Sequence, residues 1–114
     1  MPLTRQLPTN NEVIIKMEKI TCNACLAHAE KDVRFESREI EHSEHDVVVK
    51  VACGGICGSD IHYYQHGRAG MSVLKHPMVI GHEFVGVISK VPAGSDLEVG
   101  QTVAVNPSSP CNQC

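Results

Sequence analysis

Residues 78–91 read MVIGHEFVGVISKV, and this stretch decides the fold class. Six of its residues are Val or Ile, whose branched side chains suit a pleated strand and lose rotamer freedom in a helix. The stretch is bounded by Pro77 and by Pro92, which is followed by Ala-Gly-Ser, and these are turn residues. We therefore expect a strand over residues 78–91.

Further strands are expected on both sides of this stretch. Residues 47–52 are almost entirely apolar, which predicts a strand that lies inside the sheet, and residues 101–105 predict another strand. Residues 32–36 alternate between apolar and charged types, with Val33 and Phe35 on one face. This alternation is typical of a half-buried strand.

The remaining segments are less decisive. Residues 18–29 suit a strand or a short helix, and periodicity does not separate the two. Residues 56–66 are expected to begin a helical turn, with Ser59 or Asp60 as its N-cap. The polar segments in between are expected to be connections: residues 39–46 and 67–75.

The composition supports a mainly β chain with one domain. The chain has 114 residues, with 22 Val and Ile against 5 Leu and no Trp. Short strands punctuated by Gly and Pro favour a barrel or a sandwich. The net charge of −3 argues against a nucleic-acid surface, and no apolar run approaches a membrane span. The N-terminus lacks the apolar stretch of a secretory signal.

Six Cys and seven His in a chain without a secretory signal point to metal or redox chemistry. Cys57 lies between Gly55 and Gly58, whose missing side chains would let a metal approach closely, and His82 is followed by Glu83. Thiolate, imidazole and carboxylate form a plausible zinc set, in which three ligands leave one position open for substrate. The alternative is that Cys57 is a small buried apolar residue and that His82 and Glu83 are a surface pair.

Two Cys-x-x-Cys pairs add to this pattern. Cys111 and Cys114 have the spacing of half a four-thiolate zinc site, and the alternatives are an exposed pair or a disulfide. Cys22 and Cys25 form the other pair, but their distance from Cys111 along the chain far exceeds a zinc-ribbon spacing. We expect Cys22 and Cys25 to be small apolar residues in or beside an early strand.

Three motifs carry a family resemblance: GGICGSDIHYY (54–64), HPMVIGHEFVGVI (76–88) and VGQTVAVNPSSPCNQC (99–114). In this order they resemble zinc-dependent medium-chain dehydrogenases of the alcohol dehydrogenase family, most of all the polyol branch with its sorbitol and L-idonate 5-dehydrogenases. The resemblance implies a GroES-like, partly open β-barrel with short helical turns over residues 18–114. Residues 1–17 then form an N-terminal extension. Pro92 departs from the Gly or Ala usual in the family.

The resemblance also implies residue roles. Adjacent residues of a regular strand point to opposite faces, so His82 and Glu83 can share a metal only where the strand is bent or has ended. The duller alternatives are a helix cap for Ser59 and Asp60, a solvated His62 and a packing role for Tyr63. The implied roles are catalytic-zinc ligands for Cys57, His82 and Glu83, half of a structural-zinc site for Cys111 and Cys114, proton transfer for Ser59 and His62, orientation of the His ligand for Asp60, and a substrate-pocket position for Tyr63. Four further histidines have no matching role and are expected at the surface: His42, His45, His66 and His76.

The implied activity is hydride transfer from a zinc-bound secondary alcohol of a polyol or sugar acid to NAD(P). The nicotinamide would be held by a Rossmann domain later in a cytoplasmic, homo-oligomeric parent protein. The chain ends before such a domain, so we expect a fragment that is inactive by itself. Two alternatives remain open: a stand-alone GroES-like binding or assembly module, and a small zinc or thiol-redox protein that uses both Cys-x-x-Cys pairs.

Overall fold

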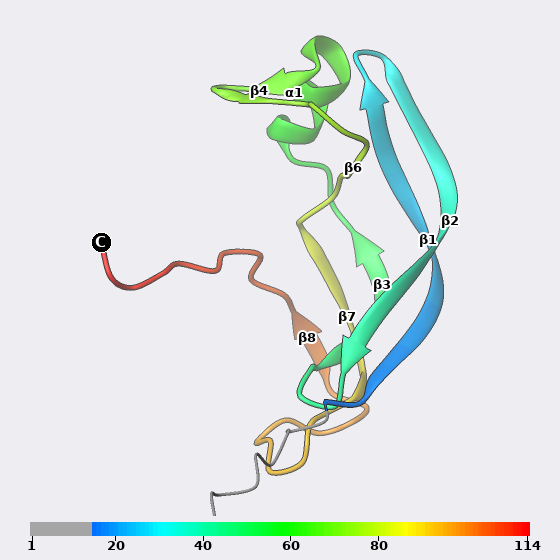
Figure 1. Ribbon diagram of the computed structural model, residues 1–114, viewed down its shortest axis with the longest axis vertical. Coiled ribbons are helices and arrows are strands. Elements are labelled where there is room, and N and C mark those ends of the chain that lie inside the picture. Colours follow the sequence, from blue (N-terminus) through cyan, green and yellow to red (C-terminus); the bar gives the residue numbers. More distant parts are fainter. Residues whose placement is uncertain (1–14) are drawn as a thin grey trace, which may run out of the picture.

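The computed structural model describes residues 15–114 and consists mainly of strands (Figure 1). No helix in this part of the chain is long and apolar enough to cross a bilayer. In chain order the elements are β1 (Met17–Ala29), β2 (Asp32–Ser43), β3 (Val48–Gly54), α1 (Gly58–His66), β4 (Arg68–Ala69), β5 (Ser72–Val73), β6 (Met78–Val79), β7 (Phe84–Lys90) and β8 (Thr102–Ala104).

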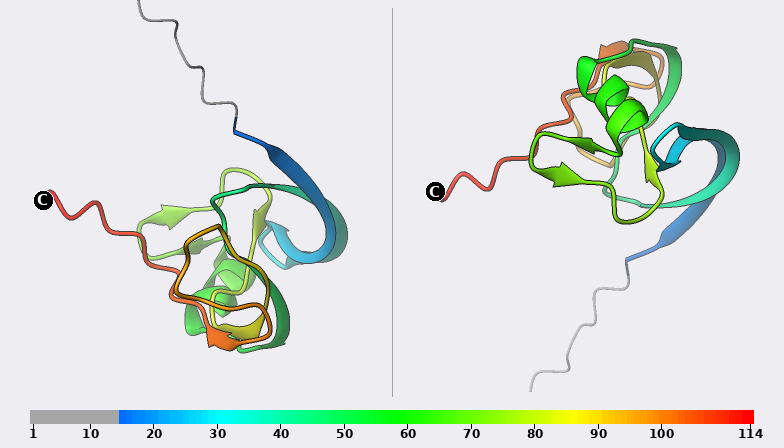
Figure 2. Two further views of the ribbon diagram at one scale, coloured as in Figure 1. Left: turned by 90° about the horizontal axis from the view of Figure 1, so that it is seen from below. Right: turned by 90° about the horizontal axis from the view of Figure 1, so that it is seen from above.

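The strands form two small antiparallel sheets and one short hairpin. β1 and β2 make a long hairpin, and β6 pairs with the other side of β1, which gives the order β2-β1-β6. The second sheet has the order β3-β7-β8, while β4 pairs only with β5. The β1–β2 ribbon curves around one side, and the segment after β8 extends away from the body in every view (Figure 2). The sheets do not close on themselves, which confirms the partly open barrel.

The core of the described residues is small. Leu26, Ala27 and Ile88 are its buried apolar side chains. Gly86 allows β3 and β7 to approach closely, because a Cβ atom at this position would lie 2.6 Å from the Val49 Cγ1 atom. Open sheets with so few buried side chains leave many apolar residues in contact with solvent.

The continuous strand expected over residues 78–91 is interrupted. β6 ends at Val79 and β7 begins at Phe84. The Ile80 N–H group donates to the Cys25 carbonyl oxygen (3.0 Å), after which Gly81 adopts a φ of 98°. This left-handed conformation, which L side chains rarely adopt, takes the backbone out of the strand.

Other expectations for the strands are corrected. β3 lies at an edge of its sheet rather than inside it, and Val51 is 58% exposed. Phe35 was expected to be half-buried and is 75% exposed, although Ala27, one pair further along the same face of the hairpin, is fully buried. Residues 39–43 continue β2, since their pairing with β1 runs to the Met17–Ser43 pair. Residues 18–29 are a strand, and residues 67–75 contain the β4–β5 hairpin.

His42 was expected at the surface but is buried. It lies near the end of β2, where the Lys90 Nζ atom from β7 approaches its Nδ1 atom at 3.3 Å. The two ends of β2 and β7 therefore cover this imidazole.

The helical turn expected over residues 56–66 is confirmed as α1, although its N-cap is Cys57 rather than Ser59 or Asp60. Asp60 is instead the third helical residue, and its carboxylate accepts a hydrogen bond from the Cys57 N–H group (3.0 Å). The Lys31 N–H group, in the β1–β2 turn, donates to the Tyr64 carbonyl oxygen (2.6 Å). This bond fixes α1 against the end of the long hairpin.

Candidate metal centre

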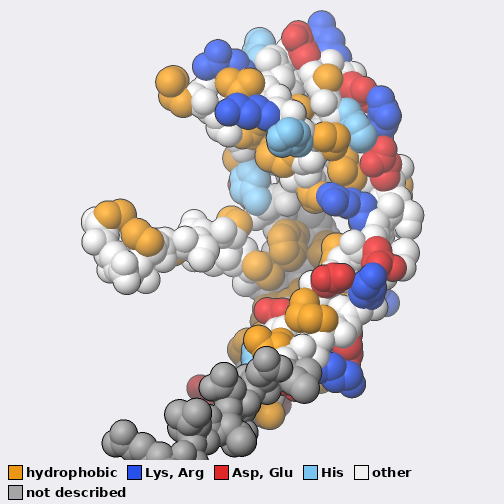
Figure 3. Space-filling view, in the orientation of Figure 1, with side chains coloured by type: hydrophobic (Ala, Val, Ile, Leu, Met, Phe, Trp, Pro, Cys, Tyr) orange, Lys and Arg blue, Asp and Glu red, His pale blue; other side chains and the backbone are white. Residues whose placement is uncertain are grey.

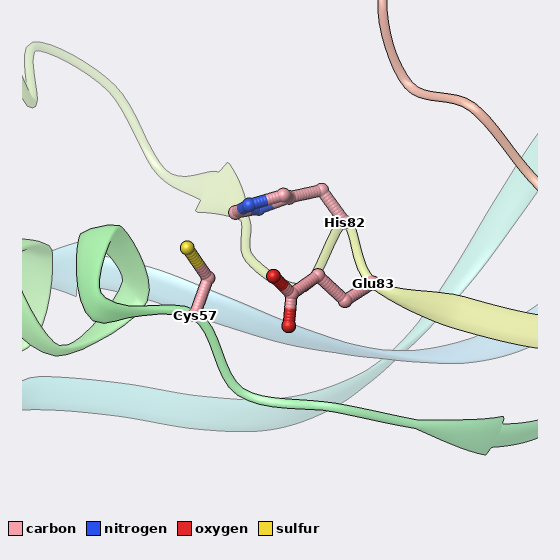
Figure 4. A group of neighbouring side chains, drawn as sticks. All are labelled: Cys57, His82 and Glu83. Carbon is pink, nitrogen blue, oxygen red and sulfur yellow. The ribbon is translucent and has the colours of Figure 1, made fainter.

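Three potential metal ligands converge between α1 and the start of β7. The Cys57 sulfur, a His82 ring nitrogen and a Glu83 carboxylate oxygen all lie within 4.8 Å of one another. They come from two segments that are distant in the sequence, and their polar atoms point into the same space (Figure 4). We call these three residues the Cys57 cluster.

The interruption between β6 and β7 explains how two adjacent residues join one cluster. On a regular strand His82 and Glu83 would point to opposite faces. They lie between the end of β6 and the start of β7, directly after Gly81 with its positive φ. The strand has therefore ended before His82 and Glu83, which is the condition for these two neighbours to share a metal.

Asp60 links the two segments of the cluster. It is only 8% exposed, and its carboxylate accepts hydrogen bonds from the N–H groups of Cys57 (3.0 Å) and Gly81 (3.2 Å). Its Oδ1 atom also lies 3.7 Å from the His82 Nδ1 atom. A carboxylate behind a ligating histidine is a common second partner of zinc sites, because it fixes the orientation of the ring.

Gly55 makes room for the Glu83 carboxylate. A Cβ atom at Gly55 would lie 3.2 Å from Glu83 Oε2 and 3.5 Å from Glu83 Cβ, and the Gly55 N–H group donates to the Glu83 carbonyl oxygen (2.6 Å). From the sequence, the glycines near Cys57 were expected to let a metal approach the thiol closely. The Gly-Gly pair before Cys57 was the available signal, but its contact with Glu83 depends on the fold. Gly58, by contrast, has nothing within 4 Å of its ideal Cβ position.

The electrostatics of the cluster favour a charged Cys57–His82 pair. The pKa of the Cys57 thiol is lowered, first by hydrogen bonding from the Ser59 hydroxyl, then from the Ser59 backbone and the His82 ring. The pKa of His82 is raised, first by its hydrogen bond with Cys57 and further by the negative charge of Asp60. A thiol that ionises readily is prepared to be a metal ligand, because the thiolate is the form that binds.

The donor set of the cluster fits a zinc ion. Zinc takes thiolate, imidazole and carboxylate ligands at about 2.0–2.3 Å, so tetrahedral ligands lie roughly 3–4 Å apart. The 4.8 Å limit of the Cys57 cluster is slightly wider, and Cys57 and His82 are half-buried while Glu83 is exposed. A hollow of about 610 Å³ opens beside His82, Glu83 and Phe84. The space-filling view shows the molecule hollowed between the part that carries α1 and the strands below it (Figure 3).

The other predicted residues of α1 divide into two groups. Ser59 and Asp60 contact the cluster. His62 is exposed, and its ring is tilted by 36° against that of His66 with the centroids 5.7 Å apart, while the Tyr63 hydroxyl donates to Ser72 Oγ (2.8 Å). The structure therefore shows contacts of His62 and Tyr63 with α1 and β5 rather than with the cluster.

Cys111 and Cys114 form a separate pair of thiols. Their sulfur atoms lie 3.2 Å apart, and both residues are exposed in the segment that extends beyond β8 (Figure 1). Among residues 15–114 they belong to no group of three potential ligands. Cys22 and Cys25 lie on β1, partly buried, and likewise join no such group within the described residues.

Proteins of similar sequence include an L-idonate 5-dehydrogenase and a D-xylulose reductase. The chain is 41% identical over 96 residues to the L-idonate 5-dehydrogenase (NAD(P)(+)) of Escherichia coli K12, which covers 84% of this chain and 28% of that protein. It is 53% identical over 85 residues to a probable D-xylulose reductase A of Neosartorya fischeri, which covers 72% of this chain and 24% of that protein. The chain thus spans about a quarter of the length of these relatives.

Solved structures show the same similarity. The crystal structure of L-idonate 5-dehydrogenase from Escherichia coli matches with a TM-score of 0.79 and 40% identity, over 86% of this chain and 28% of that one. A short chain alcohol dehydrogenase from Escherichia coli CFT073, solved with NADH, matches with a TM-score of 0.66 and 38% identity, over 82% of this chain and 27% of that one.

The family model of the alcohol dehydrogenase GroES-like domain matches residues 43–114. This segment is more than half of the chain, and it contains the whole Cys57 cluster together with Gly55 and Asp60. The chain belongs to the alcohol dehydrogenase GroES-like domain family.

Proposed function

We propose that this chain is the zinc-binding N-terminal part of an NAD(P)-dependent dehydrogenase that acts on a polyol or a sugar acid. The observation that carries the proposal is the convergence of Cys57, His82 and Glu83, held by Asp60. The names of the relatives, an L-idonate dehydrogenase and a D-xylulose reductase, support the substrate class. In this proposal residues 1–17 are an extension and residues 18–114 are the GroES-like domain.

Cys57, His82 and Glu83 would hold the zinc ion, and Asp60 would keep the His82 ring in orientation. A bound zinc ion supplies Lewis-acid chemistry, which lowers the pKa of an alcohol. Ser59 is next to the cluster, and its hydroxyl would accept the proton of the alcohol as it releases its own proton. His62 is three residues further along α1, and side chains at this spacing are neighbours on a helix surface, so His62 would pass the proton to solvent.

The remaining functions belong to the full-length parent protein. NAD(P) binding would come from a Rossmann domain outside this chain, so the chain alone is expected to be inactive. Tyr63 would line part of the substrate pocket, and Cys111 and Cys114 would supply half of a structural zinc site. The parent would be a cytoplasmic homo-oligomer, as the family resemblance implies.

The proposal predicts that zinc depends on the cluster and not on the terminal thiol pair. Elemental analysis of the purified chain should find one zinc per chain, lost in Cys57→Ser and retained in Cys111→Ser. Cys111→Ser is a matched control, since it removes the same sulfur from an exposed pair outside the cluster.

The other outcomes separate the alternatives. Zinc that is lost only in Cys111→Ser contradicts the proposal and favours the thiol-redox or zinc-storage alternative. A folded chain that takes up no zinc also contradicts it and favours an assembly module. Reduction of NAD by the pure chain with any polyol would contradict the expectation that the chain alone is inactive.

A further inference from the structure

β2 has one edge without a partner strand in the described part of the chain. It pairs with β1 on one side only, and β1 then pairs with β6, so β2 is the outer strand of its sheet. Between Asp32 and His42, the described residues provide no backbone hydrogen bonds to the opposite edge. Such an edge presents a row of free N–H and C=O groups, which is a template for another strand.

The charges along this edge complement themselves. If two copies of β2 run antiparallel with Phe35 opposite Phe35, then Arg34 of each copy lies opposite Glu36 of the other. In the same register Asp32 lies opposite Arg38. Oppositely charged residues at such positions stabilise a strand pair, whereas like charges destabilise it. In this register, all four charged positions of residues 32–38 are matched across the pair. Within the chain, Arg34 already forms an ion pair with Asp32 (2.8 Å), and Glu36 Oε1 lies 2.9 Å from His28 Nε2, so the charges of the second copy would join these contacts.

Phe35 gives a second reason for a partner at this edge. It is 75% exposed in the middle of the complementary segment, and its side chain finds no cover within residues 15–114. Two such rings on neighbouring strands would bury each other, since aromatic cross-strand pairs are among the favourable ones. Red and blue side chains alternate over the part of the surface where the β1–β2 ribbon runs (Figure 3).

We propose that two copies of this chain associate through the β2 edge, antiparallel and centred on Phe35. The sheet β2-β1-β6 of each copy would then join its counterpart in one continuous six-stranded sheet across a two-fold axis. A single strand pair buries less than the approximately 1,200 Å² of a standard interface, so the dimer is expected to be weak and reversible.

The same charges have another interpretation, in which they protect the edge from pairing. Charged residues on edge strands commonly prevent association in natural proteins. A protective edge works best with charges of one sign, because every register then brings like charges together. β2 instead carries Asp32, Arg34, Glu36 and Arg38 in alternation of sign, which favours one register of self-pairing.

Charge reversal tests the register. Sedimentation equilibrium of the full chain, from micromolar to millimolar concentration with EDTA and a reductant, should show a monomer–dimer equilibrium. Arg34→Glu or Glu36→Arg alone places like charges opposite each other twice, and should weaken the dimer about tenfold or more. The double variant R34E/E36R restores both opposite-charge pairs and should recover most of the affinity.

Glu41→Lys is the matched control, since it reverses a charge on the same strand outside the paired segment. It should leave the equilibrium unchanged. Because the double variant contains both single changes, its recovery also excludes a trivial loss of folding. A monomeric wild-type chain at millimolar concentration, or a double variant as weak as either single variant, contradicts the proposal.

Cross-linking gives an independent test of the centre of the pairing. Opposite residues of antiparallel strands have Cα atoms about 4.5–5.5 Å apart, which is within the range that a disulfide requires. F35C should therefore form an intermolecular disulfide between the two copies of position 35 under mild oxidation, identified by peptide mass spectrometry. S37C should not, because its two copies are offset along the strands. Equal cross-linking of F35C and S37C overturns the register.

Discussion

Cys57 and the Cys111–Cys114 pair both offer thiols to a metal, but the structure supports them very differently. Cys57 is half-buried and faces His82 and Glu83, and Asp60 hydrogen-bonds to both backbone segments that carry these ligands. Cys111 and Cys114 are close together but exposed, and no other potential ligand joins them within residues 15–114. A metal site therefore depends on the groups that position the ligands as much as on the ligands themselves.

Removal of the Asp60 charge should cause the largest loss of zinc affinity at the Cys57 cluster. Asp60→Asn keeps the shape of the side chain but removes the charge beside His82 Nδ1 and places an NH₂ group near backbone donors. The zinc affinity of the chain should fall about 10–100-fold, as is typical when a supporting partner is lost. Competition titration with a chromogenic chelator measures this change.

Asp46→Asn is the control for Asp60→Asn. The Asp46 carboxylate also accepts a backbone hydrogen bond, from Ser43 N–H (2.7 Å), but it lies in the turn between β2 and β3. Its substitution should lower the stability of the fold without changing the zinc affinity. Equal losses of affinity in both variants would show that Asp60 acts only through folding.

A methyl group at Gly55 should lower the zinc affinity by a smaller factor. Gly55→Ala brings a Cβ atom to 3.2 Å from Glu83 Oε2, so the carboxylate must move away from its place in the cluster. We expect a several-fold loss of zinc affinity from the same titration. Gly58→Ala is the matched control on the other side of Cys57, where the added Cβ has open space. An equal loss in both variants would contradict the role of Gly55.

The smallest expected change concerns the ionisation of Cys57. In the zinc-free chain the Cys57 thiol should react with iodoacetamide at a lower pH than an ordinary thiol, because its pKa is lowered chiefly by Ser59. Ser59→Ala removes the first of these contributions, so the pKa should rise and the reaction midpoint should move to higher pH. The pKa of Cys111 is lowered mainly by the Gln113 backbone, so its midpoint should stay unchanged. Peptide-resolved mass spectrometry follows both thiols in one sample, and a shift at both would refute a local effect.

Much of the fold was predictable from residue type and alternation. The strand over residues 101–105 and the helical turn over 56–66 are confirmed as β8 and α1, because branched residues and turn residues act locally. Alternation alone did not predict what covers each face. Phe35 has the pattern of a half-buried residue but is 75% exposed, and His42 has a polar context but is buried beside Lys90.

The candidate site was predictable as a set of residue types but not as an arrangement. Cys57, His82 and Glu83 were selected from their chemistry and from the family resemblance, and the structure brings all three together. The break that allows His82 and Glu83 to share a space was not visible in MVIGHEFVGVISKV, where the apolar pattern predicts a continuous strand. It depends on bonds of Ile80 and Gly81 to Cys25 and Asp60, which are distant in the sequence.

The bond from the Lys31 N–H group to the Tyr64 carbonyl oxygen makes this amide a probe of the contact between the β1–β2 hairpin and α1. Lys31 is in the turn of the β1–β2 hairpin with a φ of 57°, and its amide bonds to α1 instead of to its own hairpin. Deuterium can replace this hydrogen only when the helix and the hairpin separate. The protection of this single amide therefore reports how often the ribbon and the helix that follows Cys57 separate.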